Sequence, residues 1–307
     1  MTTAYLTHPE CHKHDMGTHH PECPSRMTAI ENRLIATGLL SRLKRVEGPK
    51  ADKTHLQRVH SKSYVEAVFS RAPATGMIHL DGDTAMNPHS LDAALYAAGA
   101  AVKAIDLVLA GEVDNAFCNI RPPGHHAGRA NAAGFCIFNN VAVAAAHALE
   151  HHGLQRVAIA DFDVHHGDGT ENIFHDDQRV MLCSTFRHPY YPYSGAGSGN
   201  DHIINVPLPA GSNGAVFRTA VTEHWLPALE HFQPELVLIS AGFDAHKEDD
   251  MGGLKLVEDD YIWVTEELIA IAEASANGRI VSLLEGGYAL QALARSVGAH
   301  IECLIKP

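Results

Sequence analysis

The sequence lacks the features of several protein classes. Its N-terminus has no basic region followed by an apolar run, so we expect no secretory signal peptide. No apolar run reaches the roughly 20 residues that cross a bilayer, so we expect no membrane anchor. Positive charge is also scarce, and the formal net charge is −13 with histidine counted as neutral. This charge argues against a nucleic-acid or anionic-membrane surface and is compatible with cationic substrates.

Cysteines are few and scattered, at positions 11, 23, 118, 136, 183 and 303. Those at 118, 136 and 183 fall within apolar runs, which is typical of buried thiols. Reduced thiols predict a protein of a reducing compartment, and the cytoplasm is the simplest one.

Histidine is unusually abundant, with 23 residues. Many lie in residues 4–26, which contain Cys11, His12, His14, His19, His20 and Cys23. One interpretation is a second, structural zinc site, and the other is an ordered polar loop at the rim of a pocket. The spacings fit no standard zinc finger, which favours the loop.

Apolar runs alternate with helical patterns along the chain. Strands are expected at 115–119, 156–161, 180–186, 236–240 and 280–284, and a loop at 76–88. Helices are expected at 24–36, within 54–69, and at 90–110, 139–151, 215–232, 258–276 and from about 290. This alternation predicts an α/β fold with a mostly parallel central sheet and helices on both faces. No repeat, low-complexity segment or linker is visible, which predicts a single domain over residues 1–307.

Polar clusters follow the expected strands, at 121–128, 161–168, 184–193, 244–246 and 285–288. In open parallel sheets, ligands bind outside the carboxyl ends of the strands. We therefore expect the five clusters to converge on one pocket.

The cluster richest in potential metal ligands is the stretch 159–169. If the chain stays extended there, Asp161, Asp163 and His165 point to one side. Carboxylate oxygens and neutral imidazole suit a divalent transition metal. Because a catalytic zinc keeps three protein ligands and one open position, a third ligand must come from elsewhere. Asp244 is the best candidate, since it follows an apolar strand, although such an Asp can also be a helix cap or a solvated loop residue. The oxygen-rich set favours Zn²⁺, with Fe²⁺ as the alternative.

His125 and His126 provide candidate acid–base groups on a loop made rigid by two prolines and a glycine. A pair of histidines is often inert, but Asp161 and Asp168 remain free to orient them and to raise their basicity. Tyr288 follows two glycines and can stabilise an oxyanion beside a metal, or it can simply anchor a turn. Phe135 and Tyr191 can line a narrow slot or belong to the core.

Four motifs in register resemble the histone deacetylase / acetylpolyamine amidohydrolase family over roughly residues 5–300. They are Arg-Pro-Pro-Gly-His-His-Ala at 121–127, Asp-Phe-Asp-Val-His-His-Gly-Asp-Gly at 161–169, Ser-Ala-Gly-Phe-Asp-Ala at 240–245 and Leu-Glu-Gly-Gly-Tyr at 284–288. The segment His-Pro-Glu-Cys-Pro-Ser-Arg at 20–26 is similar to the family's N-terminal motif. The Pro-Pro-Gly-His-His form is similar to that of the class II branch and its bacterial relatives.

The resemblance implies the arginase/deacetylase fold and a set of roles for single residues. Zinc would bind to Asp163, His165 and Asp244. His125 would pair with Asp161, His126 with Asp168, and Tyr288 would be the oxyanion donor. Potassium would lie near Asp161, Asp163, His165, Ser184 and Thr185, held largely by carbonyl oxygens. Gly134, Phe135, Tyr191, Met251 and Gly286 would line the acyl-lysine tunnel.

The implied reaction is removal of acetyl (acyl) groups from lysine side chains in peptides or proteins. The alternative is hydrolysis of small acetylated polyamines, because Glu248, Asp249 and Asp250 make the loop around Met251 acidic. The apolar Met251 at the expected rim favours acyl-lysine. Two further classes are an arginase-like dimanganese hydrolase and a metal-dependent binding protein without activity. The sequence is compatible with a homo-oligomer.

Overall fold

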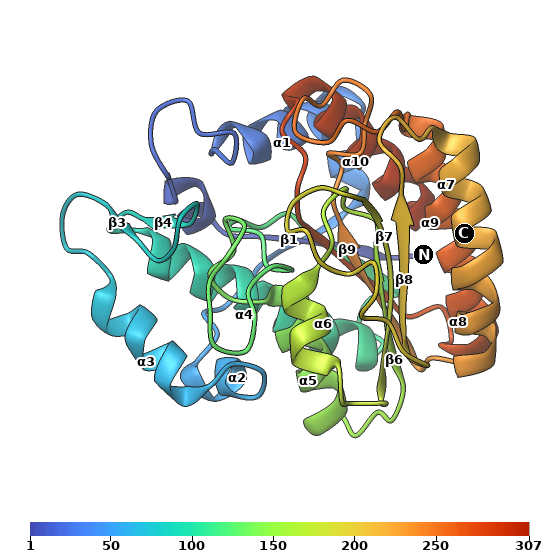
Figure 1. Cartoon of the computed structure of the whole chain (residues 1–307), viewed down its shortest axis with the longest axis horizontal. Coiled ribbons are helices and arrows are strands. Elements are labelled where there is room, and N and C mark those ends of the chain that lie inside the picture. Colours follow the sequence, from blue (N-terminus) through green and yellow to red (C-terminus); the bar gives the residue numbers. More distant parts are fainter. Residues whose placement is uncertain (307) are drawn as a thin grey trace.

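A parallel sheet of eight strands forms the centre of the molecule (Figure 1). The computed structural model describes residues 1–306. From edge to edge the strand order is β2-β1-β5-β10-β9-β6-β7-β8, and all neighbouring strands pair in parallel. The strands are β1 (Thr3–Thr7), β2 (Lys44–Glu47), β5 (Asn115–Cys118), β6 (Val157–Asp161), β7 (Val180–Arg187), β8 (Ile203–Leu208), β9 (Leu236–Ala241) and β10 (Ile280–Leu284). The predicted single-domain α/β class with a mostly parallel sheet is confirmed.

Two layers of helices cover the sheet, each with its own apolar core. One face carries α2 (Lys53–Gln57), α3 (Lys62–Arg71), α4 (Ser90–Leu109), α5 (Asn140–Glu150) and α6 (Asp168–Phe174). The other carries α1 (Ser25–Ala36), α7 (Gly214–Ala220), α8 (Leu226–Phe232), α9 (Glu258–Ser275) and α10 (Leu290–Ile305). Because both faces are covered, every residue of the four central strands is buried. This explains the continuous apolar runs of those strands.

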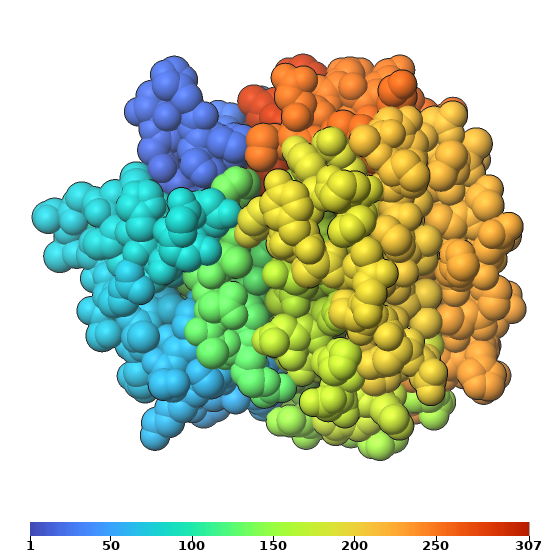
Figure 2. Space-filling view, viewed as in Figure 1, coloured from blue at the N-terminus to red at the C-terminus, as the bar shows by residue number. Residues whose placement is uncertain are grey.

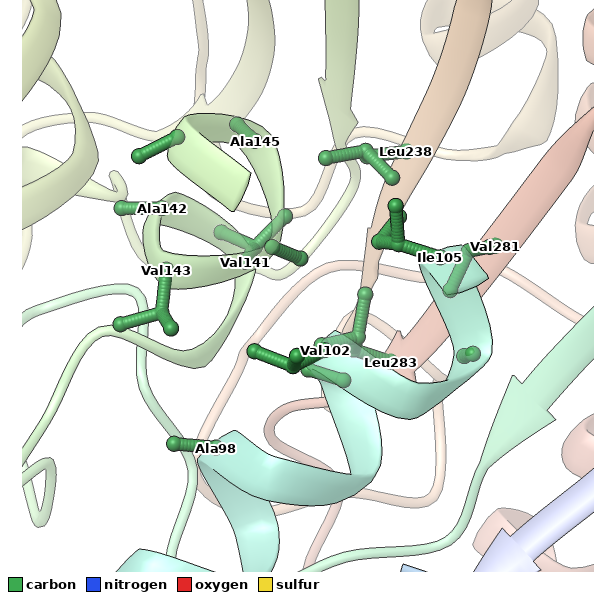
Figure 3. Packing of buried hydrophobic residues seen from close by; sticks show 14 of the residues in the cluster. Ala98, Val102, Ile105, Val141, Ala142, Val143, Ala145, Leu238, Val281 and Leu283 are labelled. Atoms are coloured by element: carbon green, nitrogen blue, oxygen red, sulfur yellow. The ribbon is translucent and has the colours of Figure 1, made fainter. Parts of the chain in front are cut away.

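The packing of α4 and α5 on the sheet shows how the first core is filled (Figure 3). Small residues such as Ala98 and Ala142 let the helices approach closely, while Ile105 lies near Val281 of β10. All of these side chains are essentially inaccessible to solvent. Full burial of a side chain such as Ile105 stabilises the fold by about 1.5–3 kcal/mol. The alanine-rich composition of α4 is therefore a packing requirement.

Three strands of the central sheet were not expected from the sequence. β2 and β8 lie at the two edges of the sheet and are partly exposed. β2 is mostly polar, and Asn205 and Pro207 interrupt the apolar residues of β8, so neither strand shows a continuous apolar run. β1 is buried, but it has only five residues and the histidine-rich segment follows directly, so its apolar pattern is too short to predict a strand. The expectation of a polar loop from residue 4 onward is therefore wrong for residues 4–7.

Two other segments differ locally from the expectation. The predicted loop 76–88 contains a small antiparallel pair, β3 (Ile78–His79) and β4 (Ala85–Met86), whose turn is closed by Asp81 accepting from the backbone N–H groups of Asp83 and Thr84. The predicted helix 215–232 widens to a π-helix at Val221–Trp225. Pro227 follows this turn and has no N–H to donate, which favours a local change of hydrogen bonding.

The N-terminal segment packs against the segment that precedes α4, as the blue and cyan surfaces show (Figure 2). Asn87 Nδ2 donates to the carbonyl of Lys13, and His14 Nδ1 lies 2.7 Å from Ser90 Oγ. Cys11 is buried against the carbonyl of Ala93. Within residues 1–306, the cysteines and histidines of this segment do not meet in a cluster with metal-ligand spacing.

Candidate active site

Asp163, His165 and Asp244 meet at the carboxyl edge of the sheet. His165 Nδ1 lies 3.0 Å from Asp163 Oδ1 and 3.2 Å from Asp244 Oδ2. One potential ligand atom from each residue lies within 4.8 Å of the other two, and all three residues are buried. The loops after β6 and β9 provide the side chains, because these two strands are neighbours in the sheet.

The geometry of the first loop differs from the extended chain that the sequence suggested. β6 ends at Asp161, and Asp163 and His165 lie beyond it in a bent segment. Asp161 Oδ1 accepts from the N–H of Asp163, and Asp163 Oδ1 accepts from the N–H of His165. These local bonds from Asp side chains to the backbone two residues later make successive turns. These turns bring the two potential ligands together. The alternation of side chains along an extended strand, which the sequence suggested, does not.

The donor set fits a divalent cation. Asp244 is fully buried, and its Oδ1 accepts from the N–H of Val164. Its Oδ2 makes no well-aligned hydrogen bond within residues 1–306, although His165 Nδ1 lies 3.2 Å away. Burial and the neighbouring Asp163 raise the pKa of Asp244 to about 7. An unpaired buried carboxylate is costly, and a cation between it and Asp163 would remove that cost.

Gly286 packs directly against the carboxylates of this candidate cation site. Its N–H donates to Asp163 Oδ2 over 2.8 Å. A Cβ at position 286 would overlap the carboxylates of both Asp244 and Asp163. Gly286 therefore lies against the carboxylates and does not line the substrate pocket described below, as the sequence had suggested.

Two histidine–aspartate pairs lie beside the cluster. His125 Nδ1 is 2.9 Å from Asp161 Oδ2, and His126 Nδ1 is 2.7 Å from Asp168 Oδ1. Each imidazole is thereby oriented through Nδ1, which leaves Nε2 available. Of the two histidines, only His126 lines the pocket.

The electrostatic environments of the two imidazoles differ. Burial opposes a charge on His125, but Asp161 and Asp163 outweigh it and hold the pKa of His125 well above its usual range. Burial, together with a charged His125 next to it, lowers the pKa of His126 to about 4. Adjacent residues of one loop are thus biased towards opposite protonation states.

A pocket of about 200 Å³ leads to the cluster. Of the residues predicted to line it, Gly134, Phe135, Tyr191 and Met251 do so. Asp83 and Tyr190 line it as well and were not singled out in the sequence. The remaining lining residues are His126, His165 and Tyr288. Aromatic walls around a small mouth suit a thin, linear side chain.

Position 134 requires a glycine because the backbone there lies against His126. Its φ of 53° lies in the left-handed region, and a Cβ there would overlap the ring of His126. Phe135 follows with a φ of 69°, and its ring lies perpendicular to that of Tyr288 at a centroid distance of 6.0 Å. This short turn therefore places one pocket wall and leaves room for one candidate base.

Tyr288 is held mainly through its backbone and by packing. The guanidinium of Arg26 lies 5.0 Å from the centre of its ring and also donates to the carbonyl of Gly287. Burial raises the pKa of the Tyr288 hydroxyl well above its usual range, which keeps it a hydrogen-bond donor.

Asp249 positions Tyr288, and sequence reasoning missed it. Its Oδ2 accepts from the N–H groups of Tyr288 and Ala289, at 2.6 and 2.8 Å, and its Oδ1 accepts from Met251. In the sequence it is one of three consecutive acids, and nothing there marks it as different from its neighbours.

Asp249→Asn is expected to lower kcat by about 10- to 100-fold, because one of the two acceptor oxygens becomes an NH₂ that only donates. The side chain can then no longer accept from the N–H groups of Tyr288, Ala289 and Met251 together, and Tyr288 would shift. Asp250→Asn is the matched control, since Asp250 is exposed. Steady-state kinetics and metal content of both variants test this. Equal kcat values in the two variants would show that Asp249 does not position the tyrosine.

A buried charged network under the site was also missed. Glu22 accepts hydrogen bonds from Arg121 and Arg26, and Arg26 donates to the carbonyls of Glu285 and Gly287. Glu285 Oε2 accepts from the N–H groups of Gly124 and His125, and burial raises its pKa to about 7. Glu22 and Arg26 belong to the 20–26 motif, but only the tertiary structure shows that they support the loops at 124–125 and 285–288.

The residues proposed to lie near potassium occupy neighbouring positions. Asp161 pairs with Ser184 in the register of β6 and β7, and Thr185 follows on β7. His166, for which we expected a structural role, lies 2.6 Å through its Nε2 from Glu171 Oε2.

The sequence model of the histone deacetylase domain family matches residues 20–304 of the chain. This chain belongs to the histone deacetylase family. The resemblance seen in the four motifs is thereby confirmed. The family's fold also agrees with a solved structure, the HDA15 HD domain, which superimposes with a TM-score of 0.92 at 33% identity and covers 99% of this chain and 89% of that one.

Relatives of this chain occur in several organisms. A histone deacetylase-like amidohydrolase of Pseudomonas aeruginosa is 38% identical, over 88% of this chain and 72% of its own. A probable deacetylase of Archaeoglobus fulgidus is 37% identical, over 95% of this chain and 82% of its own. The human polyamine deacetylase HDAC10 is 36% identical, over 99% of this chain and 48% of its own. These names describe amide hydrolases, and membership of this family places the chain among hydrolases.

Proposed function

We propose that the protein is a zinc-dependent deacetylase that removes acetyl groups from the Nε atom of lysine side chains. The observation that carries the proposal is the Asp163–His165–Asp244 cluster at the base of a narrow aromatic pocket, with His126 and Tyr288 in the lining. Membership of an amidohydrolase family supports the reaction class.

The three clustered residues would hold the catalytic ion. Two carboxylates and one imidazole suit zinc, and ferrous iron is the alternative for so oxygen-rich a set. When bound, the ion supplies Lewis-acid chemistry that polarises the amide carbonyl and lowers the pKa of water to about 7. A potassium ion near Asp161, Asp163, His165, Ser184 and Thr185 is part of the same proposal, as a structural ion.

His126 acts first as a base and then as an acid. Asp168 accepts a hydrogen bond at Nδ1, so Nε2 is the free atom on the pocket side. It takes the proton of the attacking water and passes it to the nitrogen of the leaving amine. His125 lies behind it, tied to Asp161, and contributes positive charge to the site. Water is consumed, the C–N bond breaks, and acetate and a free amine are released.

Tyr288 stabilises the charge that develops on the substrate. Its hydroxyl donates to the carbonyl oxygen as that oxygen becomes an oxyanion in the tetrahedral intermediate. Asp249 and Arg26 fix the backbone and ring of Tyr288, so the donor is in place before the reaction begins.

The pocket rim supports an acyl-lysine substrate. Met251 lines the mouth and presents no charge. Of the three acids that precede it, Glu248 is bound to Arg295 at 2.7 Å and Asp249 to the backbone at Tyr288. Asp250 is exposed, so the loop keeps part of its negative charge, but offers less of it to a distant ammonium group than three consecutive acids suggest.

One observation favours acetylated polyamines as the second candidate. Asp83 lies in the pocket lining, where a carboxylate can meet a cationic amine. Its Oδ1 accepts from the N–H of Gly134, the residue before Phe135 in the pocket wall.

The substrate proposal predicts that kcat/KM for an acetyl-lysine peptide exceeds that for N-acetylputrescine by about tenfold or more, since one to two apolar contacts are worth about 1–3 kcal/mol. Activity should be lost on treatment with a chelator and return with added zinc. A higher kcat/KM for N-acetylputrescine than for the peptide would favour the hydrolysis of acetylated polyamines. Turnover that survives complete metal removal would contradict the metal-dependent mechanism itself.

A further inference from the structure

A second group of potential metal ligands lies far from the active site, and the proposed reaction does not use it. It joins the last turn of α4 to the end of α5 and consists of Asp106, His147, His151 and His152, called here the α4–α5 histidine cluster. One potential ligand atom from each of the four lies within 4.8 Å of the other three.

The distances within the cluster are close to those of a metal site. Asp106 Oδ1 lies 2.8 Å from Nε2 of His147 and 2.8 Å from Nε2 of His152. The ring of His151 stacks on that of His147 at a centroid distance of 4.8 Å and meets that of His152 at 4.9 Å. Ligand atoms around a tetrahedral zinc are about 3.3 Å apart, as its bond lengths of about 2.0–2.1 Å require. In the structure the two contacts of Asp106 have hydrogen-bond length, and the four atoms lie within 4.8 Å of one another, so an ion would replace these hydrogen bonds and draw the outer atoms closer.

The local sequence provides this arrangement through helix geometry. His147 and His151 are four residues apart, so their side chains lie one turn apart on the same face of the helix. His152 follows where the helix has ended, and it can therefore turn back towards Asp106 on the neighbouring helix. Three imidazoles and one carboxylate form a ligand set that suits zinc and its neighbours copper and nickel.

The position of the cluster also favours a cation. α4 leads into β5 and α5 into β6, so both helices end at the amino edge of the sheet, opposite the active site (Figure 1). The carboxyl-terminal ends of two helices carry partial negative charge, and here they lie side by side. His151 is exposed and the side chain of His152 is 25% exposed, so an ion can enter from solvent.

Arg58 lies next to the cluster and would compete with an ion. Its NH1 group is 2.8 Å from Nδ1 of His147, and its Nε is 3.7 Å from a carboxylate oxygen of Glu150. A metal at Nε2 of His147 leaves the proton on Nδ1, which then cannot accept from Arg58. The guanidinium must turn to Glu150 when an ion binds.

We propose that the α4–α5 histidine cluster binds one zinc ion, in addition to the catalytic ion, and that this ion fastens the end of α5 to α4. The other end of α5 supports the active-site loop, because Asn139 donates to the carbonyl of Ala127 and Asn140 to that of Pro122. The site is therefore a structural one that secures the helix behind the catalytic histidines.

The test is metal analysis of protein without a histidine tag, dialysed against buffered free zinc. The wild type is expected to hold about two zinc ions per chain, and Asp244→Ala about one, since it loses only the catalytic ion. His151→Gln/His152→Gln should also hold about one, and the combination of all three substitutions none. His224→Gln/His231→Gln is the matched control, because it removes two exposed histidines elsewhere and should retain both ions.

Two further measurements separate a built site from chance binding. Zinc should raise the melting temperature of Asp244→Ala, and not that of the same chain with His151→Gln/His152→Gln. Arg58→Gln should bind the second ion more tightly than the wild type. A wild-type chain that holds only the ion lost in Asp244→Ala, or a second ion that survives removal of His151 and His152, would overturn the proposal.

Discussion

Replacing Tyr288 by phenylalanine is expected to lower kcat by about 100- to 1000-fold, the usual loss for one oxyanion donor. We expect the loss to come from the hydroxyl alone, because the variant keeps the other contacts of Tyr288. The ring still packs at right angles to Phe135 and beneath Arg26, and Asp249 still holds the backbone, so only the hydroxyl is lost. KM should change little, because the hydroxyl contributes most when charge develops on the substrate oxygen.

Metal content and melting temperature decide whether that loss is chemical. Both should match the wild type in Tyr288→Phe, since Tyr288 is not one of the three clustered ligands. Tyr190→Phe is a useful control: Tyr190 also lines the pocket, but its hydroxyl donates to the carbonyl of Met251. If Tyr288→Phe turned over at nearly the normal rate, the oxyanion role would have to be abandoned.

His126→Ala is expected to lower kcat by about 100- to 10,000-fold, the range for loss of a general acid–base group. His125→Ala should lose less. His126 lines the pocket, whereas His125 lies behind it, bound to Asp161 and 3.9 Å from Asp163. Only His126 can therefore exchange protons directly with water or the leaving amine.

The two variants must be compared at equal metal content, because His125 touches a carboxylate pair that includes a proposed ligand. Single-turnover rates with an acetyl-lysine peptide give the cleanest ranking, since they exclude product release. Should His125→Ala prove the slower of the two with its metal retained, the roles of the two histidines would be exchanged.

Much of the site could be predicted because it lies in the loops after strands. The apolar runs at 157–161 and 236–241 are legible in the sequence, and polar residues directly after parallel strands must lie at one edge. Asp163, His165 and Asp244 followed from this rule. The way in which these side chains meet could not be predicted, because it depends on turns made by hydrogen bonds from Asp side chains to the backbone.

Positioning residues were much harder to predict. Asp249 differs from Glu248 and Asp250 only in what it contacts, and a run of acids is usually a solvated surface. Glu22 and Arg121 lie about 100 positions apart, and their buried ion pair depends on the packing of the N-terminal segment against the sheet. Such pairs carry no local periodicity or spacing.

The sequence by itself determined the α/β class, the edge of the sheet at which the proposed site lies and the residues proposed to form it, because helix and strand periodicity and residue chemistry are local properties. Only the tertiary structure decided that His126 and not His125 faces the pocket, that Gly286 lies against the carboxylates, and that Asp106 meets three histidines from the end of α5. These are contacts between distant segments, and their geometry is fixed by packing.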